Sequence, residues 1–408
     1  MISQDILKYS RATCIARPSV LLGSLVFLTP LLTLLVPLSL ATLLPLLVLF
    51  AVICRAVSGA PRFRFSGMPA IVVAAIIIVA AASAGWSFSA ELTWDKLPRT
   101  AVIAVVGVVL LAAMSGLEPA QGRTISKAFL AGIALAFVSI LAGRVIGEFL
   151  IRTGAIEGSV PNFLNNFNRP LSLLSIMIWP AAVTLTDRRP AYGIAAVIAC
   201  LALFATFQTG AATAAIAFGM IVFAAVYAAP RIMAPLTGAL LGISVLLAPT
   251  IGDMLPPPKA MFEQLSLPRS AYHRLLIWQF ASEKITERPL LGWGFNTSRA
   301  IPGGEENLDV SEAALPLHPH NAALQWRLEL GILGAIFGAG LFFLAAVSAG
   351  CYGRNRIAQA GGVATVASAF CIGMLSFGAW QSWWLSGLFI IAGITVLACR
   401  NPEKSSDA

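Results

Sequence analysis

Twelve apolar stretches, each close to the length of a membrane-crossing helix, constrain the fold of this chain more than any other feature. A helix needs about 20 apolar residues to cross the hydrocarbon core of a bilayer. Backbone polar groups in lipid have no water to bind, so a spanning segment must satisfy them internally, as a helix does. The predicted helices cover residues 18–36, 38–54, 69–87, 100–117, 128–150, 171–186, 191–208, 210–228, 234–251, 328–350, 361–379 and 383–399.

The composition agrees with a chain that is surrounded mainly by lipid. Of 408 residues, 58% are hydrophobic and 11% are charged, whereas a soluble domain carries about 25% charged residues. The net charge of +9 is spread over short basic clusters between apolar stretches, which favours anionic lipid headgroups over nucleic acid as the partner. The apolar region from Pro18 is too long for a cleaved signal peptide. We therefore predict an all-α polytopic membrane protein with about twelve transmembrane helices.

The positions of lysine and arginine predict the orientation of these helices, because short cytoplasmic loops are enriched in both. If the N-terminus is cytoplasmic, nearly every inward loop is short and basic, and both termini lie inside. The inward basic residues are Lys8, Arg11, Arg17, Arg55, Arg62, Arg64, Arg123, Lys127, Arg188, Arg189, Arg231, Arg354, Arg356, Arg400 and Lys404. No cysteine falls in an outer loop, so no disulfide framework is predicted.

One long hydrophilic segment interrupts the regular pattern and divides the chain into three parts. Residues 1–251 carry the first nine helices, 252–327 form an outer loop, and 328–408 carry the last three helices and a cytoplasmic tail. Within the loop, Ala271–Arg288 has helical character and stops before Pro289. A long ordered loop in a compact protein is usually functional, so we expect the chemistry here.

All three histidines of the chain, His273, His318 and His320, lie in this outer segment. Continuing the tenth membrane helix upstream would place His320 on the same face as Leu324, Arg327 and Gly331, at the mouth of the bundle. Histidine titrates near neutral pH and can accept a proton from an attacking hydroxyl. The alternative is an interfacial histidine that only caps a helix. No cluster of histidine and cysteine has metal-ligand spacing, so no metal is predicted.

Two arginines are candidates for holding phosphate. Arg169 precedes Pro170 at the outer start of the sixth helix, and Arg274 follows His273 in the outer segment. A guanidinium matches phosphate oxygens in bidentate fashion and keeps its charge. If both point at the same cavity as His320, they would clamp a diphosphate beside a base. The alternative for each is an arginine that binds lipid headgroups at the interface.

Two further groups of residues have structural explanations. Arg144 and Glu148 lie four residues apart in the fifth helix, a spacing that favours an ion pair within one turn. The run Trp380-Gln381-Ser382-Trp383-Trp384 lies at the outer turn before the last helix. An interfacial aromatic belt explains this run, with a sugar-stacking platform as the second reading.

Four segments together resemble the signature of bacterial O-antigen ligases and the related O-antigen polymerases. They are Arg274-Leu275-Leu276-Ile277-Trp278, Glu287-Arg288-Pro289-Leu290-Leu291-Gly292-Trp293-Gly294, His318-Pro319-His320-Asn321 and Glu329-Leu330-Gly331. Ten residues separate His320 from Gly331, a spacing associated with the ligases. Asn168-Arg169, followed by Ile178-Trp179-Pro180, is similar to a second ligase segment. The motifs cover about a third of the chain, and the rest resembles the family only in its helix-rich layout.

The resemblance implies an enzyme of the bacterial inner membrane that moves O-antigen polysaccharide from undecaprenyl diphosphate to the lipid A-core oligosaccharide on the periplasmic face. It implies no metal and no other cofactor, and direct attack would invert the anomeric centre. Carried onto this sequence, His320 would deprotonate or orient the acceptor hydroxyl. Arg274 and Arg169 would hold the diphosphate and stabilise charge on the leaving group. The same signature suggests four substrate-binding residues, His318, Asn321, Trp278 and Arg288.

Other functions remain open at this level. An O-antigen polymerase would share the donor chemistry but use a second lipid-linked glycan as acceptor, and a related ligase would use a protein hydroxyl. A transporter or flippase would suit twelve helices with both termini inside. Against it, the segments show no repeat, and intramembrane charge is nearly absent, whereas ion-coupled carriers usually need some.

Overall fold

The computed structural model describes residues 2–59, 67–186, 190–207, 209–254, 256–307 and 312–400, and within these ranges the chain is helical with no strand. The α-helices are α1 Ile2–Leu35, α2 Leu40–Ser58, α3 Gly67–Ala82, α4 Ala90–Ser115, α5 Pro119–Arg152, α6 Val160–Asn165, α7 Asn168–Thr186, α8 Pro190–Thr206, α9 Gly210–Ala228, α10 Pro230–Met254, α11 Pro258–Leu265, α12 Arg269–Glu287, α13 Ala322–Tyr352, α14 Arg356–Leu375 and α15 Ser382–Cys399. Short 3-10 turns are η1 Pro37–Ser39, η2 Ser83–Gly85 and η3 Ser298–Ala300.

Each of the twelve predicted membrane helices coincides with a helix of the structure, and the prediction of an all-α polytopic membrane protein is confirmed. Eleven helices in the described part of the chain are long and apolar enough to cross a membrane. The remaining one, α8, has an apolar stretch of only Ala191–Thr206. At about 1.5 Å per residue, its 17 residues span about 26 Å, somewhat less than a hydrocarbon core of about 30 Å.

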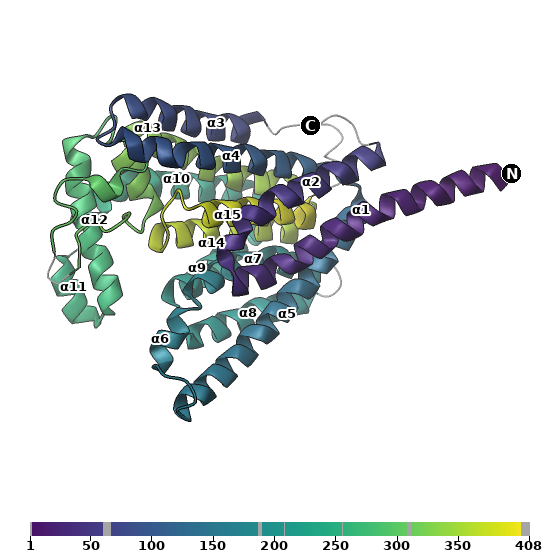
Figure 1. The fold of residues 1–408 in the computed structure, drawn as a ribbon, viewed down its shortest axis with the longest axis horizontal. Helices are drawn as coiled ribbons and strands as arrows, with labels where there is room; N and C mark the ends of the chain where they lie inside the picture. Colours follow the sequence, from purple (N-terminus) through teal and green to yellow (C-terminus); the bar gives the residue numbers. More distant parts are fainter. Residues whose placement is uncertain are drawn as a thin grey trace.

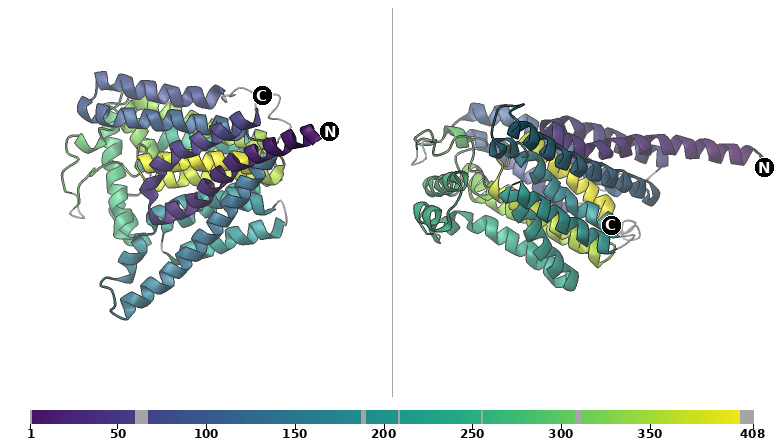
Figure 2. Two further views of the ribbon diagram at one scale, coloured as in Figure 1. Left: turned by 45° about the vertical axis from the view of Figure 1, so that its right-hand side comes forward. Right: turned by 90° about the horizontal axis from the view of Figure 1, so that it is seen from below.

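The long helices run roughly side by side, and α12 crosses one end of the bundle nearly at right angles to them (Figure 1). We call this end, formed by α6, α11, α12 and residues 288–320, the loop end. The start of α1 and the end of α15 lie at the opposite end (Figures 1 and 2). The start of α1 and the end of α15 therefore share one side of the bundle, while the assignment of that side to the cytoplasm stays a prediction.

Arginines at this opposite end bond to carbonyls that the ends of the helices leave free, and we call it the basic end. The Arg400 Nη1 atom donates to the Ser115 carbonyl at 2.7 Å, and the Arg354 Nη1 atom donates to the Ala398 carbonyl at 2.6 Å. The C-terminal end of a helix carries partial negative charge, so cations are favourable there. Basic residues that the sequence presents as orientation signals thus also close the ends of α4 and α15.

The core is centred on α7, whose residues from Pro170 to Val183 are all buried. It runs antiparallel to α14, because the Trp179 indole nitrogen donates to the Ser368 hydroxyl at 2.7 Å and Val183 lies against Gly361. On α5, the predicted pair is confirmed, with Arg144 Nε 2.8 Å from Glu148 Oε1. The bundle is therefore held by apolar packing and by few internal charges.

The helix α12 lies across the loop end because it has an apolar stripe at four-residue spacing. Ile277, Ala281 and Ile285 are buried and form one hydrophobic cluster with Leu324 and Leu328 of α13. The predicted helix over 271–288 corresponds to α12, which begins two residues earlier and ends one residue earlier. This helix of the long loop is thus packed onto the bundle.

A sharp break interrupts α13 at Gly331, whose φ of 63° and ψ of −151° are not helical. Gly338 lies against the Trp326 ring, although twelve residues of straight helix would separate the two by about 18 Å. The helix therefore folds back at Gly331. A Cβ atom at this position would lie 2.1 Å from the Leu290 carbonyl oxygen, so only glycine fits.

The loop after α12 is joined to the broken part of α13 by backbone hydrogen bonds. The amides of Trp293 and Gly294 donate to the carbonyls of Leu328 and Glu329 at 2.9 and 2.8 Å. In return, the Ile332 amide donates to the Leu290 carbonyl at 3.1 Å. A helix break leaves backbone groups without intrahelical partners, and this loop supplies them. Two of the sequence motifs, 287–294 and 329–331, therefore meet as one structural unit.

Candidate active site

The candidate base, His320, lies at the loop end immediately before α13. It has a left-handed backbone conformation, with φ of 56°, and Asn321 caps the helix by accepting a hydrogen bond from the Leu324 amide at 3.0 Å. The expectation that His320 shares a helical face with Leu324, Arg327 and Gly331 is therefore wrong. The helix starts two residues after His320 and breaks at Gly331.

The hydrogen bond of His320 determines which ring nitrogen carries the proton. Its Nδ1 atom lies 2.6 Å from the carbonyl oxygen of Ser376, the residue that follows α14. A carbonyl oxygen can only accept, so Nδ1 must donate, and the neutral ring then keeps its lone pair on Nε2. A histidine oriented in this way is prepared to accept a proton at Nε2.

Arg274 approaches the same end of α14. Its Nη1 atom donates to the Leu375 carbonyl at 2.8 Å, and the side chain is half-buried. Burial lowers the pKa of Arg274 from its ordinary value, but a guanidinium still keeps its charge. The adjacent carbonyls of Leu375 and Ser376 therefore hold a cation and a histidine side by side, where the dipole of α14 presents its negative end.

The surroundings keep His320 neutral near pH 7. Burial lowers its pKa, and the charges of Arg274 and His273 lower it further, while the hydrogen bond to Ser376 acts in the opposite direction. A general base must be unprotonated before it acts. The balance of these effects leaves the base form populated at neutral pH.

His318 supports His320 and is itself unsuited to act as a base. It is buried, its Nδ1 atom lies 3.1 Å from the His320 amide nitrogen, and its Nε2 atom lies 3.1 Å from the Gln381 amide nitrogen. Burial lowers the pKa of His318 to about 3, with smaller contributions from the charges of His320, Arg299 and Arg274. Its Nδ1 atom accepts from the His320 amide, so the ring serves to orient the loop.

Two residues of α12 hold the loop that leads into α13. The Trp278 indole nitrogen donates to the Pro319 carbonyl at 2.9 Å. Five residues earlier, His273 Nε2 lies 3.0 Å from the Ala313 carbonyl and its Nδ1 lies 2.8 Å from a Glu312 carboxylate oxygen. Trp278 and His273 therefore determine where the loop crosses α12 and Arg274.

Arg169 lies at the loop end as well, exposed at the second position of α7. The contacts of Trp179 with Ser368 and of Val183 with Gly361 define the antiparallel register of α7 and α14. Extending this register places Arg169 level with the C-terminal end of α14, the end that holds Arg274 and His320. The three predicted catalytic residues thus lie at one level of the bundle.

Arg288 is separated from this group. Its guanidinium stacks on the Trp293 ring at 4.2 Å from the centroid. Arg288 follows Arg274 by 14 residues along α12 and its C-terminal cap, which corresponds to about 20 Å of helix. Its contact with substrate stays a prediction, and such a contact would involve a part of the substrate far from His320.

The turn between α14 and α15 contributes residues that the sequence analysis did not assign to the site. Ser376 and Gln381 hold the two histidines, and Gly378 lies against the His318 ring. The tryptophans of this turn are buried, with exposed fractions of 6% for Trp380 and 3% for Trp384, so they do not form a lipid-facing belt. Arg299, on the loop, acts on His318 through its charge. In the sequence, the run Trp380-Gln381-Ser382 was the one signal that could have drawn attention to this turn.

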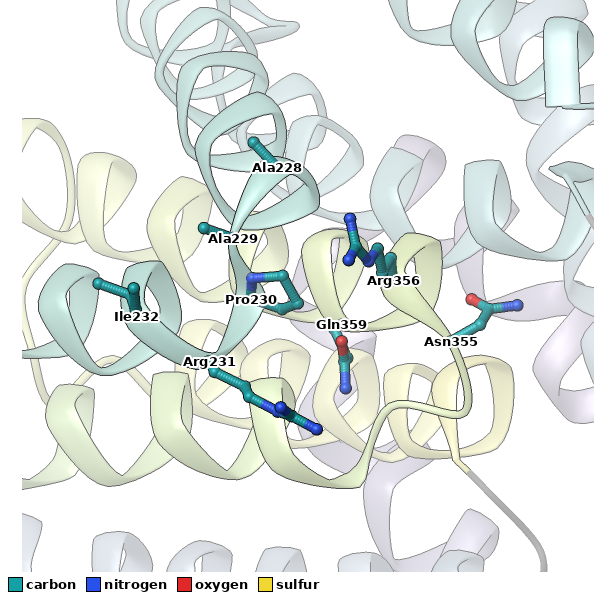
Figure 3. A pocket seen from close by; sticks show the side chains of 8 residues that line it. All are labelled: Ala228, Ala229, Pro230, Arg231, Ile232, Asn355, Arg356 and Gln359. Carbon is teal, nitrogen blue, oxygen red and sulfur yellow. The ribbon is translucent and has the colours of Figure 1, made fainter.

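A cavity of about 470 Å³ lies far from these residues, between the α9–α10 turn and the start of α14 (Figure 3). Arg231, Arg356 and Gln359 line it, together with apolar side chains. It offers no side chain that could act as a general base, so it is not the candidate active site. In the part of the chain that the structure describes, no three histidine, cysteine, aspartate or glutamate side chains are arranged to hold a metal ion.

Comparisons with known proteins agree with the motifs. A family model described as O-Antigen ligase matches residues 194–339, a range that includes α12, His320 and Gly331. A protein of Rickettsia conorii named "Putative polysaccharide ligase" is 31% identical over 298 residues, which cover 70% of each chain. A protein of Rickettsia bellii with the same printed description is 30% identical over 288 residues, or 67% of each chain.

Proposed function

Because this chain belongs to the O-antigen ligase family, we propose that it transfers O-antigen polysaccharide from undecaprenyl diphosphate to the lipid A-core oligosaccharide. The reaction takes place on the periplasmic face of the bacterial inner membrane, where the loop end would lie. One observation carries the proposal: the Ser376 carbonyl holds His320 with its Nε2 lone pair free, next to the cation of Arg274. A base beside a fixed positive charge suits transfer from a diphosphate.

In the proposed reaction, Nε2 of His320 accepts the proton of an acceptor hydroxyl on the core sugar. The acceptor oxygen then bonds to the anomeric carbon of the donor glycan, and the bond from that carbon to the diphosphate oxygen breaks. Undecaprenyl diphosphate leaves with the electron pair, and attack from the opposite face inverts the anomeric centre. A diphosphate is a good leaving group, so the protein mainly aligns two lipid-anchored substrates.

The arginines stabilise the leaving group. Among the described residues, Arg274 uses one of its five N–H donors, on the Leu375 carbonyl, so the others can bond to phosphate oxygens. Arg169, at the same level of the bundle, provides the second cation. Charge grows on the diphosphate as the glycosidic bond breaks, and preorganised cations favour that change. No metal is required in this scheme.

The remaining predicted substrate residues have positioning roles in this proposal. Asn321 caps α13, Trp278 holds Pro319, and His318 orients the His320 amide. Each is engaged with the protein backbone or with a neighbouring side chain. They determine where His320 lies and leave substrate contact to His320 and the arginines.

The proposal can be tested by reconstituting the purified protein in vesicles with lipid-linked glycan and rough lipopolysaccharide in EDTA. Transfer of glycan to lipid A-core is expected with the native chain and is expected to be lost in His320→Ala. Glu283→Gln is the control, because Glu283 is an exposed carboxylate of α12 that contacts Gln279 and not the histidine segment.

Other outcomes would redirect the assignment. A donor glycan that grows longer without reaching lipid A-core would indicate a polymerase. Glycan transport without transfer, unchanged in His320→Ala, would indicate a flippase.

A further inference from the structure

Glu329 is the charged side chain most completely enclosed by the protein near the site, with an exposed fraction of 0%. Its Oε2 atom lies 2.6 Å from both the Asn296 amide nitrogen and the Trp380 indole nitrogen. Its Oε1 atom accepts from the Gln325 amide at 3.0 Å and from the Ser298 hydroxyl. Amide and indole nitrogens of this kind can only donate, so the pocket suits a carboxylate.

These partners belong to three separate parts of the chain. Asn296 and Ser298 lie on the loop after α12, Gln325 lies on α13, and Trp380 lies on the α14–α15 turn. Gln325 adds a second link to that turn, because its Oε1 atom accepts from the Ala379 amide at 2.7 Å. A buried carboxylate is costly unless it is fully hydrogen-bonded, so a pocket of four donors indicates a specific role.

The turn that Glu329 and Gln325 hold is the same turn that holds the histidines. Ser376 accepts from His320, Gln381 contacts His318, and a Cβ atom at Gly378 would lie only 2.7 Å from the His318 ring. Residues 376–381 therefore contact the histidine pair on one side and the Glu329 pocket on the other. A shift of this turn would move the carbonyl that determines the tautomer of His320.

We propose that Glu329 is a positioning residue for His320 that acts through the α14–α15 turn. It links the loop, α13 and the turn, and so keeps the Ser376 carbonyl in hydrogen-bonding range of His320. This inference rests on the proposed function, in which His320 is the base. It also gives a role to the 329–331 motif beyond the break at Gly331.

The test measures kcat, KM for the lipid-linked donor, and the pH profile of kcat in the reconstituted assay. Trp380→Phe removes one hydrogen bond of Glu329, and Trp384→Phe is its control, since the described residues show no hydrogen bond from the Trp384 indole. We expect Trp380→Phe to lower kcat by about tenfold with KM little changed. Trp384→Phe should stay within about twofold of the native chain, a difference of a few tenths of a kcal/mol.

Glu329→Gln tests the carboxylate itself, with Glu283→Gln as the control, because Glu283 is an exposed carboxylate on α12. The groups that act on His320 are Arg274 and His273 on α12, His318 on its own segment, and the Ser376 carbonyl. The Ser376 bond raises the pKa of His320. If Glu329→Gln weakens that bond, the acid limb of the kcat profile moves to lower pH, which a general loss of folded protein cannot produce.

The outcomes separate this inference from the proposed function. Native transfer that is lost in His320→Ala, with Trp380→Phe and Glu329→Gln retaining native kcat and pH profile, would overturn the positioning role alone. A lower yield of active protein with an unchanged pH profile would also overturn it, since Glu329 would then serve folding only. Absence of transfer by the native chain would overturn the proposed function instead.

Discussion

Replacing Gly331 with alanine is expected to destabilise the protein strongly, because the break in α13 depends on this residue. At its φ of 63° and ψ of −151°, a residue with a side chain costs about 1–3 kcal/mol. The new Cβ atom would lie 2.1 Å from the Leu290 carbonyl oxygen, so the loop backbone has to move by about 1 Å or more to restore ordinary contact distances.

That movement would weaken the hydrogen bonds between the loop and α13. They join Trp293 to Leu328, Gly294 to Glu329 and Ile332 to Leu290, and each contributes about 1 kcal/mol. We therefore expect the free energy of unfolding to fall by about 3–5 kcal/mol. Glycan transfer should fall with it, because the same loop carries Asn296 and Ser298 of the Glu329 pocket.

The matched control is Gly340→Ala, also in α13. Nothing lies within 4 Å of a Cβ atom at Gly340, so alanine there should leave stability unchanged or raise it by about 0.5–1 kcal/mol. Unfolding by sodium dodecyl sulfate in mixed micelles would compare the two variants, and amide hydrogen exchange would report on Trp293 and Gly294. Equal unfolding midpoints and retained protection of these amides would refute the argument.

Three further predictions concern the site and its orientation. Burial and the charge of Arg274 lower the pKa of His320 from the ordinary value of 6.5, so the ring becomes protonated only at a pH below that value. As the pH is lowered, kcat should therefore begin to decrease only below pH 6.5. A decrease of kcat that begins above pH 6.5 would contradict this. Arg274→Lys keeps the charge but loses bidentate bonding, so kcat/KM should fall about 10–100-fold. The control, Arg152→Lys on α5, should keep kcat/KM near the native value. Equal kcat/KM values for the two variants would remove Arg274 from the site. Gln264 is exposed on α11 at the loop end, and Cys351 is exposed at the last turn of α13. In intact cells whose outer membrane is permeabilised, an impermeant maleimide should label Gln264→Cys but not the native Cys351. The reverse pattern would invert the predicted orientation.

Much of the fold follows from the sequence because lipid imposes strict conditions on the backbone. Any apolar run of about 20 residues must be a helix there, and all twelve predicted runs are helices in the structure. The helix of the outer loop was also predictable, because its apolar residues recur at four-residue spacing and Pro289 follows it. The boundaries were less predictable, as α4 begins at Ala90 and α13 at Ala322, several residues before the predicted starts.

The residues of the candidate site were also visible in the sequence, since His318, His320 and Arg274 lie in its one long hydrophilic segment. Their arrangement was not. His320 was expected on a helical face, but it precedes the helix in a left-handed conformation. Its hydrogen bond reaches Ser376, 56 residues away along the chain. Local periodicity has no information about such a pair.

By itself, the sequence determined the membrane helices, the long hydrophilic loop between the ninth and tenth of them, and the candidate residues for a site, because these depend on local composition and on the solvent. Only the tertiary structure decided the break at Gly331, the tautomer of His320 and the enclosure of Glu329. These depend on contacts between the loop, α13 and the α14–α15 turn, which are distant in sequence. Such contacts form only when the helices pack, and packing is a property of the whole bundle.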